Sequence, residues 1–367
     1  MDTRSNNNGQ TTYIGIDQHK HYSQVVVKDW AGVTLDEQKL YHEDQDMMQE
    51  YFKRFTPGET KIAVEASGSY YWLHNLLEEL NLSMELAHPL KVKMIAESAI
   101  KTDHIDAHAL ADLLRTNFLP TAYIPSKDTR ALRERLRHRI ILVHLRSSLK
   151  NRIEAVLTKW GIFKPPEFSN LYTTDGKEWL KELKLVEPYQ SEINNYLLLI
   201  ETFTKLIKDL DREIKYYVSV DKRAEYLMTI PGIAEYTAYL ILAEIGDINR
   251  FSSPKKLTSY AGLVPSVNQS GKHIYFGRIK PGDTYLRTGL VESAHIAVRH
   301  DPYFKSRYQY LKSKKGSSKA ITAIARELLE IVWWVLKEER PYYNREKQER
   351  RRELVGSAGR PEIRHGL

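Results

Sequence analysis

The chain has 367 residues, of which 42% are hydrophobic and 28% charged, a balance typical of a folded protein with two or three domains. It contains no cysteine, which excludes disulfide bonds and zinc sites built from thiolates, and no apolar stretch reaches the roughly 18 residues of a membrane-spanning helix. The formal net charge of +8 favours a polyanionic partner, and a basic protein without such a partner is the alternative.

The first third of the chain alternates strand and helix patterns. Its polar first residues lack the apolar core of a signal peptide, so we expect a cytoplasmic protein. The strand pattern is found at residues 12–19, 22–30, 33–41, 61–67 and 83–89. Helical patterns are found at residues 44–55, 70–81 and 91–117. The first three strands are expected to form a meander, and the last helix to break near Lys101. This order predicts an α/β domain over residues 1–125.

The middle third is helical. Residues 130–157 are predicted to form one long basic helix. The next helix repeats isoleucine every seven residues, each followed three positions later by a large apolar or aromatic residue: Ile193, Tyr196, Ile200, Phe203, Ile207, Leu210, Ile214 and Tyr217. This pattern predicts a coiled-coil helical linker over residues 126–220. Its partner is either the basic helix or another subunit, and a core helix of a single bundle is the alternative.

The last third predicts a mainly helical C-terminal domain over residues 221–343. Pro231, Gly232 and Ile233 lie between two helical patterns, as in a helix–hairpin–helix turn whose backbone N–H groups bind phosphate. This signal alone also fits an ordinary turn. A glycine-punctuated region follows, and residues 319–337 predict a long closing helix. Residues 344–367 form a charged tail that we expect to be disordered.

Two carboxylates stand where apolar strands end. Asp17 follows the apolar run of "TYIGIDQH", and Glu65 has the same place in "KIAVEAS". A buried carboxylate is costly unless it is paired, and neighbouring strand ends would bring these two together. Two anions at such a distance need a cation between them. Taken singly, Asp17 could start a turn and Glu65 could cap the helix that follows.

Asp103 and Asp106 supply two more carboxylates. They lie three residues apart on one face of a predicted helix, and we expect both to point inward. Four converging oxygen ligands favour Mg²⁺ or Mn²⁺ over zinc, and such ions suit phosphodiester chemistry. An N-cap role for Asp103, with Asp106 in the first turn, is the structural alternative. His104 and His108 are expected to lie beside the acidic face rather than in the metal site.

Several ordered motifs resemble those of bacterial DEDD transposases of the insertion-sequence-one-ten family, also called bridge-RNA-guided recombinases. They are "GIDQHK", "VEASGSYYW", "KTDHIDAHALADLL", "IPGIAEYTAYLILAEIGD" and "SYAGLVPSVNQSGKHIYFGRIKPGDTYLR", and the resemblance covers about residues 11–340. It implies an RuvC-like ribonuclease H fold for the first domain and a C-terminal transposase domain. It also implies that Asp17, Glu65, Asp103 and Asp106 are the DEDD metal ligands, in that order.

The resemblance further implies a serine nucleophile that forms a transient covalent link to DNA, and Ser270 in "NQSGK" matches its position. The glycine after it would permit close approach to a phosphate, and the carboxylate site would activate the hydroxyl. Ser266, Tyr275 and Tyr285 are alternative nucleophiles. The sequence Asn-Gln-Ser-Gly is also ordinary turn composition.

Basic side chains are expected to bind nucleic acid, with ordinary surface charge as the alternative. Some would hold the scissile phosphate, and others the backbone of the structured noncoding bridge RNA that the resemblance implies. Those near the serine are Lys272, Arg278, Lys280 and Arg287. Those on the basic helix are Arg130, Arg133, Arg137, Arg146, Lys150 and Arg152.

These features together favour an RNA-guided DNA recombinase that excises and inserts a mobile element, with donor and target double-stranded DNA as substrates. A metal-dependent endonuclease or junction resolvase without a covalent intermediate is the enzymatic alternative. A basic coiled-coil scaffold for nucleic acid is the non-enzymatic one. Because recombination handles two duplexes, we expect a homodimer that assembles into a tetramer, with no membrane association.

Overall fold

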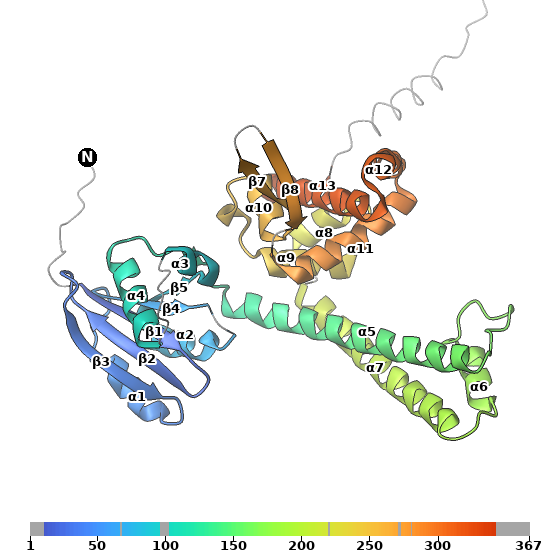
Figure 1. The fold of residues 1–367 in the computed structure, drawn as a ribbon, viewed down its shortest axis with the longest axis horizontal. Helices are drawn as coiled ribbons and strands as arrows, with labels where there is room; N and C mark the ends of the chain where they lie inside the picture. The colour runs from blue at the N-terminus through green and yellow to red at the C-terminus, as the bar shows by residue number, and fades with distance from the viewer. Residues whose placement is uncertain are drawn as a thin grey trace, which may run out of the picture. The chain divides into compact units, whose positions relative to one another are not determined.

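The chain divides into two compact units, Met1–Ile124 and Pro125–Leu367 (Figure 1). The computed structural model describes residues 11–66, 68–95, 103–218, 221–270, 273–279 and 281–342. The side chains at positions 103, 217–218, 267–276 and 278 are outside this description, as is the charged tail predicted at residues 344–367. Among the helices of the described ranges, none combines the length and the apolar character that a membrane span requires.

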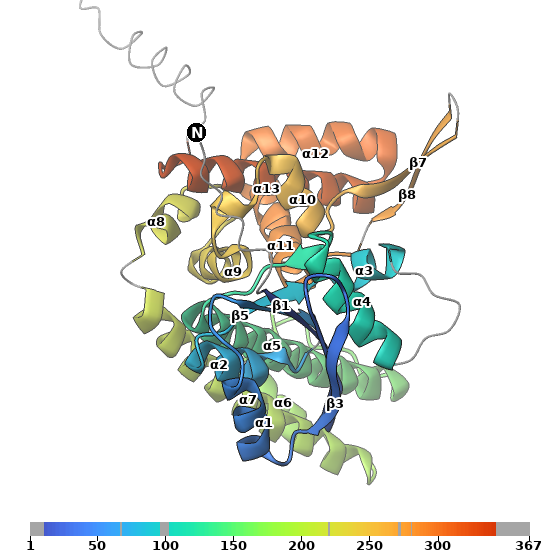
Figure 2. The ribbon, with the colours of Figure 1, turned by 90° about the vertical axis from the view of Figure 1, so that its left-hand side faces the viewer.

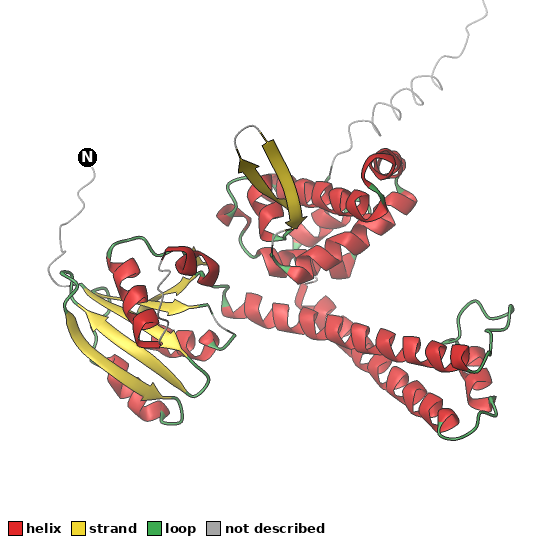
Figure 3. Ribbon diagram, in the orientation of Figure 1, coloured by secondary structure: helices red, strands yellow, loops and turns green. Residues whose placement is uncertain are grey.

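The first unit contains a mixed sheet, whose strands are yellow in Figure 3. It has six strands in the order β3-β2-β1-β4-β5-β6. Its strands are β1 (Thr12–Gln18), β2 (Tyr22–Lys28), β3 (Thr34–Tyr41), β4 (Thr60–Glu65), β5 (Ser83–Ala87) and β6 (Thr121–Ala122). The first three form the predicted antiparallel meander, whereas β4 and β5 run parallel to β1. The mixed α/β fold is therefore confirmed, and the arrangement is consistent with the expected ribonuclease H-like fold.

The helices of this unit are α1 (Gln45–Lys53), α2 (Tyr70–Glu79), α3 (Pro89–Ile95) and α4 (Asp103–Arg115). The break predicted near Lys101 lies outside the described residues, between the end of α3 and the start of α4.

Successive side chains of β1 point to opposite faces of the sheet, and each face is covered by a different set of helices. Ile14 and Ile16 are fully buried on the face covered by α1 and α2. Gly15 faces the other layer, where α4 crosses the strand. A Cβ atom at Gly15 would lie 2.0 Å from the carbonyl oxygen of Ala107 and 2.6 Å from the amide nitrogen of Ala111. Only glycine allows α4 to pack this closely on the sheet.

We expect Gly15→Ala to destabilise the first unit strongly, because the added methyl group overlaps backbone atoms of α4 that no side-chain rotation can move. Overpacking typically costs about 1–3 kcal/mol in the free energy of unfolding. Thermal melting, with hydrogen exchange of the β1 amides, measures the loss. Gly68→Ala is the matched control, since a Cβ atom at Gly68 would meet nothing within 4 Å. Equal stability of the two variants would contradict this expectation.

The second unit begins with a long antiparallel helical hairpin built from α5 (Lys127–Lys159), α6 (Thr174–Glu182) and α7 (Tyr189–Val218) (Figure 1). Arg139 on α5 binds Asp211 on α7, whereas Arg146 reaches back to Thr204, so the two long helices run in opposite directions. The four isoleucines of the predicted seam are at most 4% exposed. The seam therefore packs against the basic helix of the same chain.

The rest of the second unit is a helical bundle with one β-hairpin (Figure 2). Its elements are α8 (Lys222–Met228), α9 (Glu235–Ile245), the 3-10 helix η1 (Ile248–Arg250), α10 (Pro254–Tyr260), β7 (Pro265–Ser270), β8 (His273–Ile279), α11 (Thr284–His300), α12 (Pro302–Lys315) and α13 (Ser317–Glu338). The apolar helix α13 confirms the long closing helix predicted for this region, and it packs against α10, α11 and α12.

The predicted Pro-Gly-Ile turn joins α8 to α9. Gly232 has a positive φ of 85°, and a Cβ atom there would lie 2.2 Å from the carbonyl oxygen of Ser293 on α11. Glycine is therefore needed both for the turn and for its packing. Phosphate binding by the amides of this turn stays a prediction.

Candidate active site

Asp17 and Glu65 occupy neighbouring positions at the carboxyl ends of two parallel strands. Ile16 pairs with Val64 between β1 and β4, and the two carboxylates are the next residues of their strands. Paired residues of a sheet point to the same face, so both carboxylates project from the face that carries Gly15. Asp17 is 8% exposed and Glu65 is half-buried.

The same face of the sheet receives α4, whose direction is set by two contacts. The Lys28 amine lies 2.6 Å from the Asp112 carboxylate, and Lys28 pairs with Tyr13 at the start of β1. Ala107, nearer the start of the helix, packs on Gly15 in the middle of β1. The helix thus runs opposite to the strand, and its first turn is directed toward the end of β1 that carries the carboxylate.

This arrangement brings Asp106 toward the acidic end of the sheet, because it immediately precedes Ala107. Asp106 is half-buried, and Asp103 is the first residue of the helix, although its side chain is outside the description. Carboxylates gathered at a partly buried edge repel one another and provide the hard oxygen donors that Mg²⁺ or Mn²⁺ prefers. The donor set therefore fits such an ion. The four-ligand site itself stays a prediction.

Asp17 has one further neighbour that the sequence did not single out. The Nε2 atom of His19 lies 3.1 Å from the Asp17 Oδ2 atom. Because His19 is two residues farther along the chain, this contact orients the carboxylate locally. A carboxylate held in one orientation is better prepared to bind a cation.

Ser270, the predicted nucleophile, is the last residue of β7 and lies opposite His273, the first residue of β8. The hairpin projects from the helical bundle (Figures 1 and 2). Its base is closed, since the Asp283 amide donates to the Tyr260 carbonyl oxygen at 2.9 Å. The position at the end of the strand is established, whereas the Ser270 side chain is outside the description.

The three alternative nucleophiles differ in what their side chains face. A Cβ atom at Gly277 would lie 2.3 Å from the Ser266 Oγ atom, so this hydroxyl faces the backbone of β8. Tyr285 is half-buried on α11, with its ring centre 4.6 Å from the guanidinium carbon of Arg137. Tyr275 lies in β8 with its side chain outside the description. The side chains of Ser266 and Tyr285 thus both contact other parts of the protein, at Gly277 and Arg137 respectively.

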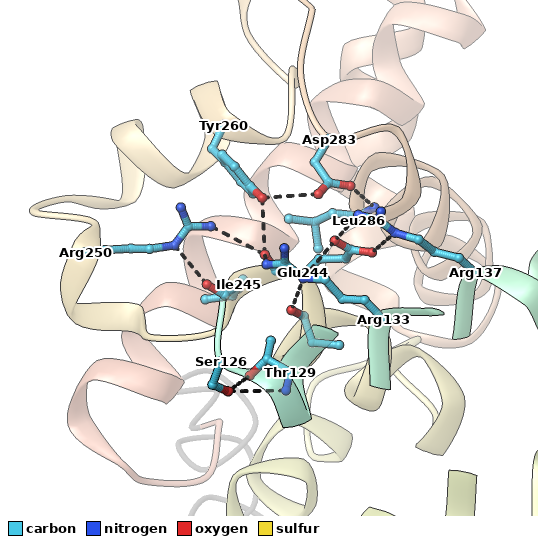
Figure 4. A network of polar contacts seen from close by, with 11 residues as sticks. Ser126, Thr129, Arg133, Arg137, Glu244, Ile245, Arg250, Tyr260, Asp283 and Leu286 are labelled. Carbon is cyan, nitrogen blue, oxygen red and sulfur yellow. Dashed lines mark hydrogen bonds and ion pairs between the residues drawn. The ribbon is translucent and has the colours of Figure 1, made fainter. Parts of the chain in front are cut away.

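A polar network joins the base of the β-hairpin to the start of α5 (Figure 4). The Tyr260 hydroxyl lies 3.3 Å from both the Glu244 carbonyl oxygen and the Asp283 carboxylate. Arg133 donates to the carbonyl oxygens of Ala243 and Glu244 at 2.7 and 2.9 Å. Carbonyls in the last turn of a helix, here α9, have no intrahelical partner and need such donors. The linker helix α5 and the base of the hairpin that carries Ser270 are therefore both hydrogen-bonded to the last turn of α9.

The side chain of Glu244 is fully buried at the centre of this network. Arg137 binds its two carboxylate oxygens at 2.8 Å each, and Arg133 approaches at 3.4 Å. Burial raises the pKa of the Glu244 carboxyl, and the hydrogen bonds from Arg137 oppose this shift. Glu244 is not among the residues predicted from the sequence, although it is the one charged residue in the apolar run "YLILAEIG".

The start of the basic helix differs from the expected nucleic-acid surface at three of the predicted positions, Arg130, Arg133 and Arg137. Arg130 and Arg133 are only 6% and 7% exposed, and Arg133 and Arg137 are bound by Glu244. The reason is that the start of α5 packs against α9, whose buried carboxylate and terminal carbonyls need cationic donors.

We expect Glu244→Ala to lower the local stability of α9 by about 3–5 kcal/mol, because it leaves the buried guanidinium group of Arg133 and the half-buried one of Arg137 without their carboxylate. Hydrogen exchange of the α9 amides measures this free energy of opening. Glu330→Ala is the matched control, since the Glu330 pair with Arg326 is partly exposed and is expected to contribute about 0–1 kcal/mol. Similar exchange in both variants would contradict a structural role for the buried network.

The remaining predicted basic residues have varied surroundings. Arg152 is exposed on α5, and Arg287 is half-buried on α11. Arg146 is half-buried and contacts Thr204, and the amine of Lys150 lies 4.5 Å from the ring centre of Tyr172. Burial lowers the pKa of Lys150, and the charge of Arg146 adds to the effect. The rest are outside the description, in full or at the side chain: Lys272, Lys280 and Arg278.

Two family models match the two parts of the chain that carry these features. A DEDD transposase model of the IS110 type matches residues 14–162, which contain the four predicted carboxylates. The model described as "Transposase IS116/IS110/IS902 family" matches residues 224–309, which contain the Ser270 hairpin. The chain belongs to the IS110 family of DEDD transposases.

This transposase is also similar to named proteins along most of its length. A probable family 20 transposase of Pseudomonas aeruginosa is 28% identical over 345 residues, which cover 90% of this chain and 98% of that protein. The transposase for insertion sequence element IS1328 of Yersinia enterocolitica is 26% identical over 337 residues, 88% and 96% of the two chains. A pilin gene-inverting protein of Moraxella bovis is 27% identical over 353 residues, 91% and 98% of the two chains. Family membership identifies an enzyme of DNA transposition.

Proposed function

We propose that this transposase is an RNA-guided DNA recombinase that excises and inserts a mobile element through a metal-binding carboxylate site and a serine nucleophile. The observation that carries the proposal is the pair of family matches, one over the carboxylates and one over the serine hairpin. Transposition of DNA follows from the family itself. The guide RNA, the metal and the covalent serine step are the parts proposed here.

Asp17, Glu65, Asp103 and Asp106 are the proposed ligands of Mg²⁺ or Mn²⁺. A bound ion of this kind stabilises charge on a phosphodiester and lowers the pKa of a coordinated hydroxyl. The chain contributes the positions of its carboxylates. Two of them are on adjacent strands, and α4 is held against the sheet by its contact with Gly15 and by the Lys28–Asp112 ion pair. Such preorganisation spares the site the cost of reordering during reaction.

Ser270 is the proposed nucleophile. Its Oγ atom would attack the scissile phosphorus, forming a serine–phosphate ester as a deoxyribose oxygen leaves and takes up a proton. Attack by another DNA hydroxyl on that ester would rejoin the strands and release the serine without an external energy source. The location of Ser270 at the projecting end of β7 supports this role, as does the orientation of the Ser266 hydroxyl toward β8.

Donor DNA, target DNA and a structured noncoding bridge RNA are the proposed nucleic-acid partners. With Arg130, Arg133 and Arg137 directed inward, the proposed contacts to phosphates are Arg146, Lys150, Arg152, Lys272, Arg278, Lys280 and Arg287. The net charge of +8 supports this class of partner, and the guide RNA rests on the resemblance of the motifs.

A homodimer that pairs into a tetramer is the proposed assembly, with a second copy packed on the α5–α7 hairpin. Ile141, Leu145, Leu199 and Leu206 are 42–47% exposed. The residue after each of them, at positions 142, 146, 200 and 207, is directed toward the other helix. One residue corresponds to a rotation of about 100° around a helix axis. In two antiparallel right-handed helices, this rotation places all four exposed side chains on the same side of the hairpin. Phe203 and Leu210, from the second row of the heptad pattern, are also only partly buried. The hairpin thus keeps exposed apolar side chains that α5 and α7 do not bury against each other, and these support self-association.

The test combines purified protein, Mg²⁺ and labelled donor and target DNA, with and without the noncoding RNA that flanks the element. We expect joined recombinant DNA only when all components are present. Cleavage that needs the metal but no RNA, and yields no joined product, would support a metal-dependent nuclease or junction resolvase instead. Binding without cleavage in any mixture would support the scaffold alternative.

A further inference from the structure

Glu37, His104 and His108 form a compact cluster in the first unit. The Nε2 atom of His104 lies 2.9 Å from Glu37 Oε1, and that of His108 lies 3.3 Å from Glu37 Oε2. One ligand atom from each residue lies within 4.8 Å of the other two. The histidines are one helical turn apart on α4, with ring centres 4.4 Å apart. Three side chains from two elements that are distant in sequence thus meet at one point.

The sheet register explains why Glu37 is at this place. Glu37 pairs with Val26, and Val26 pairs with Gly15, so the three positions form a row across β3, β2 and β1. Paired residues share a face, and this row therefore lies on the side covered by α4. The Gln24 amide donates to Glu37 Oε1 at 3.0 Å and orients the carboxylate. The Glu37 side chain is therefore held on the sheet surface that α4 covers.

The cluster offers a different chemistry from the carboxylate site. Both imidazoles direct the same ring nitrogen at one carboxylate, which gives two nitrogen donors and one oxygen donor. Three such ligands with an open fourth position are the set that Zn²⁺ takes in many proteins, and imidazole disfavours Mg²⁺ relative to transition metals. Side-chain exposures of 58% for His104, 28% for Glu37 and 24% for His108 leave the cluster open to an ion from solvent.

We propose that Glu37, His104 and His108 bind one divalent transition-metal ion, with Zn²⁺ the best fit, at a site distinct from the DEDD carboxylates. The bound ion links the first turns of α4 to β3. Since the same turns carry Asp103 and Asp106, occupancy would also hold these two carboxylates in place. That last consequence rests on the proposed function, whereas the metal site does not.

The test is calorimetric titration of the metal-free full-length protein with Zn²⁺ in excess Mg²⁺, without DNA or RNA. We expect one tight site per chain that is weakened at least about 100-fold in His104→Ala/His108→Ala, since even outer-shell partners of a metal ligand are worth about 10–100-fold. Bound Co²⁺ should show the absorption bands of a low-coordinate nitrogen–oxygen site. Zn²⁺ should raise the melting temperature of the wild type and not that of the double variant.

Three variants make the result decisive. Glu37→Gln should also weaken Zn²⁺ binding, and it keeps both histidines if the double variant folds poorly. His295→Ala/His300→Ala, which removes two exposed histidines of α11, and Asp17→Asn should both retain the site. Zn²⁺ binding that survives His104→Ala/His108→Ala, or that is lost equally with His295→Ala/His300→Ala, would overturn the proposal. Loss in Asp17→Asn would show instead that Zn²⁺ occupies the carboxylate site.

Discussion

Asp17→Asn is expected to reduce DNA strand cleavage by at least about 100-fold, because loss of even an outer-shell partner of a metal ligand costs about 10–100-fold in affinity or activity. The substitution preserves the shape of a side chain that is 8% exposed while removing its negative charge. Cleavage of labelled donor DNA over a range of Mg²⁺ concentrations measures the effect. A requirement for more Mg²⁺ would indicate a weakened metal site.

The control for this substitution is Asp46→Asn. Asp46 is exposed on α1, the helix that covers the opposite face of the sheet, and its loss makes the same change in net charge. We expect Asp46→Asn to cleave as the wild type does, and both variants to melt cooperatively. If Asp17→Asn retains wild-type cleavage, its carboxylate is a structural group at the end of β1 and the proposed metal site is wrong.

Ser270→Ala is expected to eliminate the covalent protein–DNA adduct and strand joining together. Removing a serine nucleophile from an enzyme that depends on it costs about 10⁶-fold in kcat, which would place any residual adduct below detection. The adduct is measured as labelled DNA that stays attached to protein under denaturing conditions, in reactions with Mg²⁺ and the flanking RNA. Binding of DNA should be little changed, because only one hydroxyl is removed.

Ser266→Ala is the matched control for the nucleophile. It removes the same hydroxyl four residues earlier in the same strand, from a position where the Oγ atom faces the β8 backbone at Gly277. We expect its adduct to form normally. The reverse result, an adduct lost only in Ser266→Ala, would assign the nucleophile to Ser266. An adduct present in both variants would exclude both serines and favour Tyr275 or Tyr285 as the nucleophile.

Much of the secondary structure could be predicted from local pattern. The strand meander, the two long linker helices and the closing helix follow from periodicities of two and 3.6 residues, which each segment carries within itself. The strand-end positions of Asp17 and Glu65 could be predicted for the same reason, since the apolar run that precedes each carboxylate defines where its strand ends. Membership of the family likewise depends on ordered motifs in the sequence.

Contacts between distant segments could not be predicted in this way, because they depend on strand register and on which helical face is buried. The heptads of α7 fit two partners equally well, and only the packed structure shows that α5 takes one side of the helix. Arg133 and Arg137 look like surface charges along α5 until α9 brings Glu244 against them. Glu37 meets His104 and His108 only because three strands align it with Gly15, where the absence of a side chain lets α4 approach.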